Sequence, residues 1–210
     1  IINNWPIPQV SKELDSKVRN SIKMSPVTKE NFYCKGIPKK IIGLVPGELI
    51  TTDEGSSTDY NIDKDIIKIV VIEPHKGTMH TGICYLKGLG LKSGAIGTTV
   101  AHDSHYCIIA GTNDEDIALV ANEIRKMQGG KIVVRDGKIL GSLPLPIANL
   151  MTEENPLKVI EIMNRMKKCI NIENSNIDPF MNLSFVSLAV IGDIRLLPGG
   201  VFNNKKWCFE

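Results

Sequence analysis

The sequence predicts an α+β fold in which mixed, largely antiparallel sheet layers are covered by two amphipathic helices. Apolar, β-branched runs outnumber the helical patterns along the chain. Two segments, 112–129 and 155–170, carry apolar residues at helical spacing. Asp136 and Gly137 separate two β runs in the manner of a tight hairpin turn. Strands joined by short turns pair antiparallel, and each helix can cover one face of a sheet.

Composition restricts the possible classes of protein. The 210 residues suit one domain with an appendage, with 42% hydrophobic residues and a net charge of +2. Without a basic stripe, neither nucleic acid nor a membrane surface is expected as a partner. No apolar run reaches the ~20 residues of a membrane span. The five cysteines are scattered without a CxxC pair, which favours reduced thiols and a cytoplasmic protein. The opening at Ile1, without methionine, suggests a piece of a longer chain.

Residues 1–60 are predicted to be a linker followed by a β-hairpin. Four prolines lie within 1–40, and only 11–22 has the spacing of a short helix, with Leu14, Val18 and Ile22 on one face. The rest of 1–40 reads as a connector without a core of its own. Two β runs within 40–52 flank a Pro-Gly turn, and 53–65 is expected to be a surface loop.

Residues 61–198 are predicted to form the main domain. The run 65–73 is apolar on both faces, which is typical of a central strand. Strands are expected at 83–90, 94–101 and 106–110, and a hairpin at 131–143. A capping box from Thr112 to Glu115 begins the first helix, and Asn155 followed by Pro156 begins the second.

The end of the chain is predicted to be less regular. A polar loop over 171–177 precedes a turn over 178–182. A strand is expected over 183–191 and a short one over 193–197. Residues 199–210 are expected to be a polar tail.

The densest ionisable chemistry lies in His102-Asp103-Ser104-His105, between two predicted strands. Histidines three residues apart can serve one site if the segment is a turn, whereas on a strand they would point to opposite faces. Such residues bind metals or move protons, and Ser104 could contact a substrate. The alternative is a structural corner whose polar side chains satisfy loop backbone groups.

Other chemical motifs are weaker. The glycine-rich stretch 87–94 lacks the order of a P-loop and leads into a β run, so a strand–turn–strand corner is favoured. The zinc signature of base deaminases is missing. His75 and His80 are five residues apart, and only convergence with the other pair in space could complete a metal site.

Six segments of the chain carry a recognisable pattern when taken in order: 42–50, 87–96, 100–105, 111–116, 143–148 and 178–185. Together they resemble the C-terminal region of microbial adenine deaminase, a family of the amidohydrolase superfamily. The segments come in the family's order, and the resemblance extends from about residue 40 to 198. One departure is Tyr106, where the family usually has asparagine.

The resemblance implies a role within a larger enzyme. The intact family member converts adenine and water to hypoxanthine and ammonia on a (β/α)₈ barrel. Its divalent metal ions (Mn, Fe or Zn) are bound by that barrel, upstream of this sequence. For this chain alone the resemblance implies no cofactor and no activity. Its implied partners are the barrel of the same protein and, in the intact enzyme, adenine; a homo-oligomer is expected.

Three functions therefore remain open. His102, Asp103 and His105 could face the active-site mouth and orient the purine or the surroundings of the metal. Alternatively, the domain could be an assembly module that dimerises through its sheet, with structural histidines. A stand-alone purine-binding module is the third.

Overall fold

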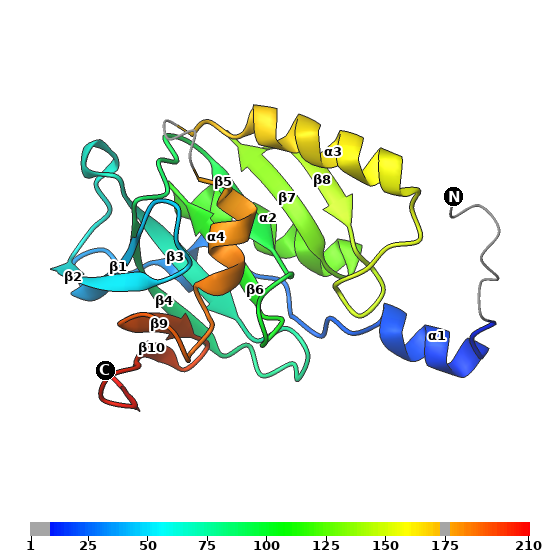
Figure 1. Cartoon of the computed structure of the whole chain (residues 1–210), viewed down its shortest axis with the longest axis horizontal. Coiled ribbons are helices and arrows are strands. Elements are labelled where there is room, and N and C mark those ends of the chain that lie inside the picture. The colour runs from blue at the N-terminus through cyan, green and yellow to red at the C-terminus, as the bar shows by residue number, and fades with distance from the viewer. Residues whose placement is uncertain (1–8, 173–176) are drawn as a thin grey trace.

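The computed structural model describes residues 9–172 and 177–210, which form two sheets and four α-helices (Figure 1). The helices are α1 (Lys12–Arg19), α2 (Asp114–Met127), α3 (Pro156–Cys169) and α4 (Pro179–Phe185). The strands are β1 (Lys39–Leu44), β2 (Thr51–Ser57), β3 (Ile66–Ile72), β4 (Thr81–Lys87), β5 (Ala95–Thr98), β6 (Cys107–Gly111), β7 (Gly130–Arg135), β8 (Lys138–Pro144), β9 (Ile194–Leu197), β10 (Gly200–Asn203) and β11 (Cys208–Phe209).

The main sheet has eight strands in the order β2-β1-β4-β3-β6-β5-β7-β8. Only the β1–β4 pair is parallel, and the other pairs of this described sheet are antiparallel. The small sheet has the order β11-β10-β9 and contacts β4. The predicted α+β class with a mixed, largely antiparallel sheet is therefore confirmed.

β3 is the central strand that its apolar sequence predicts. Ile67 and Ile69 belong to the core cluster on the face covered by α3 and α4. Val70 and Ile72 belong to the cluster on the face covered by α2. Since all four side chains are fully buried, both faces of the sheet are covered at this strand.

α2 covers one face of the sheet, as predicted. Asn113 caps it by accepting a hydrogen bond from the N–H of Asp116 (2.7 Å), one residue later than the predicted cap. The connector also contributes to this core: Ile22, Met24, Val27 and Phe32 pack in the same cluster as α2. Both the N–H and the carbonyl of Val27 bond to the side chain of Asn122. The connector therefore packs on the core of the main domain.

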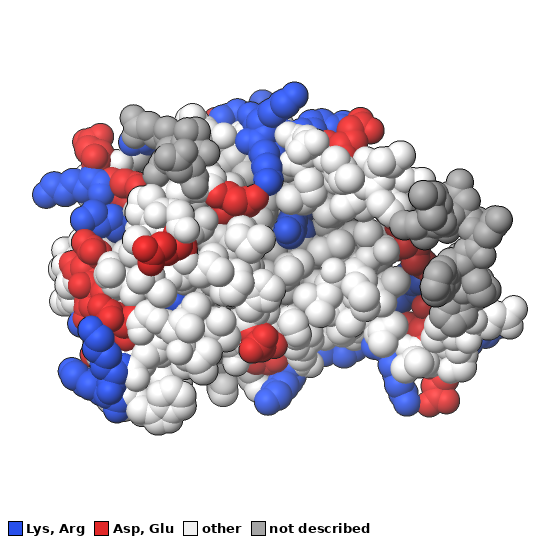
Figure 2. Space-filling model, in the orientation of Figure 1, with Lys and Arg blue, Asp and Glu red and all other residues white. Residues whose placement is uncertain are grey.

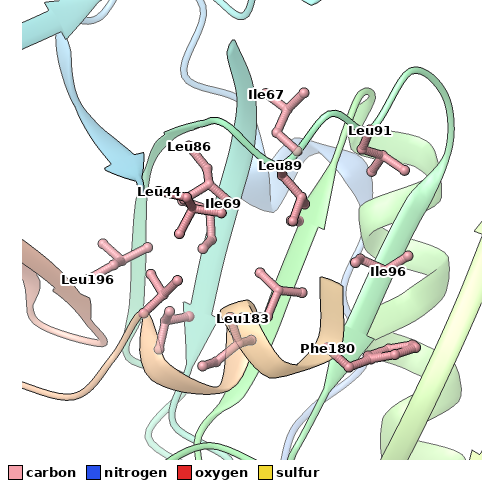
Figure 3. Packing of buried hydrophobic residues seen from close by; sticks show 14 of the residues in the cluster. Leu44, Ile67, Ile69, Leu86, Leu89, Leu91, Ile96, Phe180, Leu183 and Leu196 are labelled. Carbon is pink, nitrogen blue, oxygen red and sulfur yellow. The ribbon is translucent and has the colours of Figure 1, made fainter. Parts of the chain in front are cut away.

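The opposite face is covered by α3, α4 and the small sheet together. α3 packs mainly on β8, near the edge of the main sheet. α4 lies across the middle strands, and Phe180 and Leu183 point from it toward the sheet (Figure 3). A turn at 178–182 and a strand at 183–191 were therefore the wrong expectations. The side chain of Asp178 accepts from the N–H of Met181 (3.2 Å), and Pro179 occupies the first turn, which is the sequence of a helix start.

Two further expectations need correction. β2 extends to Ser57, so part of the predicted loop 53–65 is strand. The tail from residue 199 onward forms β10 and β11, and the ring of Phe202 lies 5.3 Å from those of both Trp207 and Phe209. Edge-to-face packing of aromatic rings stabilises such a small sheet. The loop 171–177 lies partly outside the described residues.

Charged side chains are unevenly distributed on the face that carries α4. Lys, Arg, Asp and Glu gather toward its rim, and its middle shows only a few of them (Figure 2). Among the described residues, no helix has the length and apolar character needed to cross a bilayer. All five cysteines are free thiols.

Arg195, on β9, connects segments that are far apart in the sequence. Its side chain is fully buried and donates to three carbonyls: Ile191 (2.6 Å), Phe185 (3.0 Å) and Leu49 (2.9 Å). Burial lowers the pKa of Arg195 to about 10, so the guanidinium remains charged at neutral pH. The end of α4 and the turn after β1 are thereby held to the same side chain.

Replacing Arg195 should destabilise the chain strongly. Arg195→Met leaves three carbonyls without their donor, and we expect a loss of about 2–4 kcal/mol in the free energy of unfolding. Arg195→Lys keeps the charge but not the planar fork, so most of the loss should remain. Urea denaturation followed by circular dichroism measures both. The exposed Arg165→Met on α3 is the control, with a change within about 0.5 kcal/mol. Wild-type stability of Arg195→Met would contradict this role.

Candidate functional site

The segment from His102 to His105 is a turn that joins β5 to β6, at one end of the strands of the main sheet. The N–H of His105 donates to the carbonyl of Ala101 (3.0 Å) and closes the turn. The N–H of His102 donates to the carbonyl of Ser184 in α4 (2.8 Å). The backbone of the turn is thus fixed both by its own hydrogen bond and by α4.

His102 is held through its ring as well as its backbone. The ring centroid lies 4.2 Å from that of Phe185, with the two planes tilted by 48°. Because Arg195 binds the carbonyl of Phe185, α4 presents this phenyl ring from a fixed backbone position. His102 is therefore an oriented imidazole, half-buried against an aromatic neighbour.

His105 and Ser104 carry unused hydrogen-bonding capacity. The Nδ1 atom of His105 and the Oγ atom of Ser104 are buried and have no partner among the described residues. Buried polar atoms are nearly always hydrogen-bonded, and two of the six buried side-chain atoms that lack a partner among the described residues belong to this turn. Asp103, between the two histidines, is exposed. The turn therefore exposes one carboxylate and encloses an imidazole nitrogen and a hydroxyl that have no partner within the described chain.

The loop 147–151 supports the turn from the other side. Ile147 and Met151 form a bridge with two backbone hydrogen bonds (3.0 and 3.1 Å), which places Asn149 within a closed loop. The amide of Asn149 donates to the carbonyl of His105 (3.2 Å), and its own carbonyl accepts from the hydroxyl of Thr99 (2.6 Å). Gly129 packs so closely that a Cβ atom there would lie 2.5 Å from Asn149. No side chain larger than hydrogen fits at that position.

The other two histidines lie in the loop between β3 and β4, at the same end of the strands. Nδ1 of His75 lies 3.0 Å from the carbonyl of Ser21, so this ring ties the connector to the loop. His80 is exposed. The two turns lie at the same end of the strands because Ile72, at the end of β3, pairs with Cys107, at the start of β6.

The described residues do not assemble a metal site from these parts. No group of three His, Cys, Asp or Glu side chains within 9–172 and 177–210 is close enough to hold an ion. The four histidines therefore do not converge on a common centre in the described part of the chain. The donors present in the described residues do not fit the divalent metal that the resemblance implies.

Two other motifs have plain structural roles. The glycine-rich stretch 87–94 joins β4 to β5, and the N–H of Gly90 donates to the carboxylate of Asp65 (2.8 Å). It is a strand–turn–strand corner, as predicted. Tyr106 packs against the core, and burial, followed by the charge of Glu73, raises the pKa of its hydroxyl. Tyr106 therefore stays neutral and can still exchange hydrogen bonds.

Sequence patterns did not reveal the supports of the turn. Asn149 and Phe185 contact it from 44 and 83 positions away in the chain, and neither lies in a local motif for chemistry. The one available signal was that both residues fall in or next to the resemblance segments 143–148 and 178–185.

Glu73 shapes the β3–β4 loop and should make its stability depend on pH. Its carboxylate accepts from the N–H groups of His75 and Lys76 (2.8 Å each) and from the hydroxyl of Thr78 (3.3 Å). Burial by itself would raise the pKa of Glu73, but these hydrogen bonds outweigh it and hold the pKa below 4.5. The ionised form is thus favoured in the folded chain.

We expect Glu73→Gln to lose about 1–2 kcal/mol of unfolding free energy at pH 7. The contribution of a carboxylate with a lowered folded pKa is complete above 4.5 and is lost as the pH falls through the folded pKa. The difference between Glu73→Gln and the wild type should therefore shrink below pH 4.5. Urea denaturation at pH 7 and pH 3 measures it. Glu161→Gln, whose side chain is 74% exposed, is the control, and a pH-independent difference for Glu73→Gln would contradict the assignment.

Comparison with known proteins places these features in a family. The adenine deaminase C-terminal domain family matches residues 47–208. Adenine deaminase 2 of Carboxydothermus hydrogenoformans is 39% identical over 198 residues, which are 89% of this chain and 35% of that protein. Adenine deaminase of Bacillus subtilis is 34% identical over 205 residues, covering 92% and 36%. That of Geobacillus kaustophilus is 32% identical over 217 residues, covering 98% and 37%.

The match includes the His102–His105 turn, the loop 147–151 and α4 in a single stretch. The chain spans a little over a third of the length of these relatives. The matched residues extend over most of the main sheet, both covering faces and the small sheet. The chain therefore belongs to the adenine deaminase C-terminal domain family.

Proposed function

We propose that this chain acts as the C-terminal domain of an adenine deaminase and that its His102–His105 turn forms part of the active-site mouth. The reaction is the conversion of adenine and water to hypoxanthine and ammonia. In this proposal the reacting centre and its divalent metal (Mn, Fe or Zn) belong to the part of the polypeptide outside this chain. The supporting observation is the pair of buried, unpartnered polar atoms, His105 Nδ1 and Ser104 Oγ, within a rigid turn.

The chemistry of these atoms suits a purine. The ring nitrogens of adenine accept hydrogen bonds, and its amino group donates them. A histidine near neutral pH can do either at Nδ1, and a serine hydroxyl can do both. His102 would lie beside the base as an oriented ring, and Asp103 would supply a carboxylate at the exposed side. His105 Nδ1 and Ser104 Oγ are enclosed by the chain, so they would hold the base once their side chains turn toward it. Proton transfer by a positioned imidazole or carboxylate is a usual contribution to such hydrolysis.

The contacts from the loop 147–151 and from α4 would hold the side chains of the turn in position for such a role. Asn149 fixes the backbone of His105, and Phe185 with Ser184 fixes His102. Groups that contact a reacting centre must be held to within a fraction of an ångström, and rigid neighbours achieve this.

Variants of the full-length polypeptide test the proposal. His102→Ala and His105→Ala should each lower kcat/KM for adenine by about 10–100-fold, because the purine or the metal surroundings lose a positioned group. Bound metal and the melting temperature should be unchanged. Ser104→Ala should raise KM. The steady-state rate of hypoxanthine formation and the metal content measure these effects.

His80→Ala is the matched control, because this histidine is exposed and lies outside the turn. It should leave kcat/KM at the wild-type value. If His102→Ala and His105→Ala also keep wild-type kcat/KM with normal metal content, the turn is a structural corner and the proposal fails.

A second candidate function is self-association through β8. The two edges of the main sheet differ in how they are protected from pairing. β2 carries Asp53 and Glu54, whereas the single charged residue of β8 is Lys138 at its start. Ile139 on β8 and Leu157 on the neighbouring α3 are exposed. A long edge strand with few charges is open to pairing with another strand.

Sedimentation of the chain and of an edge variant tests this second function. Pairing of β8 with β8 of a second copy predicts a dimer that Ile139→Glu converts to a monomer, because the charge would be buried between strands. Thr52→Glu on β2 is the control and should leave the dimer intact. A wild-type chain that sediments as a monomer at micromolar concentration excludes self-association as its function.

A further inference from the structure

The face that carries α4 is the candidate for an interaction surface. In the view of Figures 1 and 2, α4 lies in front of the sheet, and the loop from β8 to α3 lies to one side of it, toward α1. Few charged side chains occupy the middle of this face (Figure 2). Depletion of charge is typical of the centre of a protein–protein interface.

One apolar side chain on this face belongs to the helix that holds His102. Met181 lies one helical turn before Phe185, whose ring contacts His102. Residues four apart share one side of a helix. Phe180 and Leu183 point to the sheet, whereas Met181 is 51% exposed. A large apolar side chain is therefore left uncovered beside the turn.

A second such side chain belongs to the loop that holds His105. Met151 closes the loop 147–151 through its two hydrogen bonds with Ile147. Asn149, inside the loop, is buried and bonded to the carbonyl of His105. Met151 itself is 55% exposed. Each of the two supports of the turn thus presents an exposed methionine. A groove of about 380 Å³ lies between the end of β8 and α3, and Thr152, the residue after Met151, lines it.

We infer that Met151 and Met181 are the apolar anchors on which the remainder of the same polypeptide docks, with the His102–His105 turn between them. The relatives carry nearly two thirds of their length outside the segment that this chain matches. This inference rests on the proposed function, because a turn that contributes to a mouth requires the other part of the polypeptide to lie against it. Methionine adapts its shape to a facing surface, which suits a contact between domains.

The position of the anchors favours the same polypeptide over a second copy. The turn is bonded both to α4, which carries Met181, and to the loop 147–151, which carries Met151, so a surface lying across the two methionines would also lie over the turn. The open edge strand β8, where a second copy would pair, is a different feature of the fold. Contacts between domains of one chain commonly bury about 600–1,500 Å², which a surface spanning α4, the turn and the loop 147–151 could provide.

Variants of the full-length polypeptide test the docking. Met151→Glu with Met181→Glu places two charges in the contact, and the double variant should separate the domains. We expect a larger radius of gyration in small-angle scattering and at least tenfold faster proteolysis between the domains. The value of kcat/KM should fall, and adding His105→Ala should reduce it little further. Because both methionines are more than half exposed, the domain itself should still fold, with an unchanged circular dichroism spectrum.

Two controls keep the result interpretable. Met151→Leu with Met181→Leu retains the apolar contact and should behave as the wild type. Tyr33→Glu places a charge at a site that is 65% exposed and lies beside α2, on the opposite face of the sheet, and it should leave the domains docked.

The outcomes separate this inference from the proposed function. Unchanged scattering and proteolysis in the double glutamate variant overturn the docking, even if His105→Ala lowers kcat/KM. Separated domains support the docking, even if the histidine variants leave kcat/KM unchanged and the proposed function fails. Loss of a dimer in sedimentation, with the two domains still docked, overturns the inference in favour of a second copy as the occupant.

Discussion

Asn149 joins segments that are distant in the sequence, and the conformation of the His102–His105 turn depends on its hydrogen bonds. Its carbonyl accepts from the hydroxyl of Thr99 at the end of β5, and its amide donates to the carbonyl of His105 before β6. The same hydroxyl accepts from the N–H of Gly130, where β7 begins. The preceding N–H, of Ala148, donates to the carbonyl of Val18 in α1. The buried groups of Thr99, Gly130 and Asn149 would be left unsatisfied without their partners, so the loop has little freedom to move.

The second support of the His102–His105 turn, α4, has a different physical origin. α4 is a short helix, held to the sheet by apolar contacts and to the rest of the chain by Arg195. Its last residues supply both a carbonyl and a ring to His102. A buried amide on one side and a buried guanidinium on the other thus fix a turn of four residues. The turn itself keeps Asp103 exposed and two buried polar atoms without protein partners.

The elements predicted correctly are those whose sequence signals lie within the element itself. α2 follows from its apolar spacing and its cap, β3 from its unbroken apolar run, and the β7–β8 hairpin from Asp136-Gly137, both with the positive φ of a type I′ turn. The segment that contains α4 was predicted as a turn and a strand. Val186, Val190 and Ile191 favour β structure, but they follow α4, and the helix itself begins at the local signal of Asp178 and Pro179. The tail forms strands because its aromatic rings pack on one another, which polarity alone did not reveal.

The histidine pair could be recognised from sequence because its residues are adjacent, whereas its supports could not. Asn149 and Phe185 reach the turn only after folding has brought the β8–α3 loop and α4 to the ends of β5 and β6. The pattern of residues also could not show which polar atoms would be left without partners, because that depends on all neighbours at once. Resemblance to a family supplied the context that spacing lacked.

Arg195 has a consequence for the behaviour of the molecule in acid and in salt. Its three hydrogen bonds within the described chain go to carbonyl oxygens, which do not titrate, and its side chain is fully buried from counterions. The Lys167–Asp178 ion pair at the start of α4 is partly exposed, and it weakens when Asp178 is protonated or when salt screens it. The two ends of α4 therefore respond differently to their surroundings. Acid or high salt loosens the first turn of the helix while its last turn, which carries Phe185, keeps its attachment to β9.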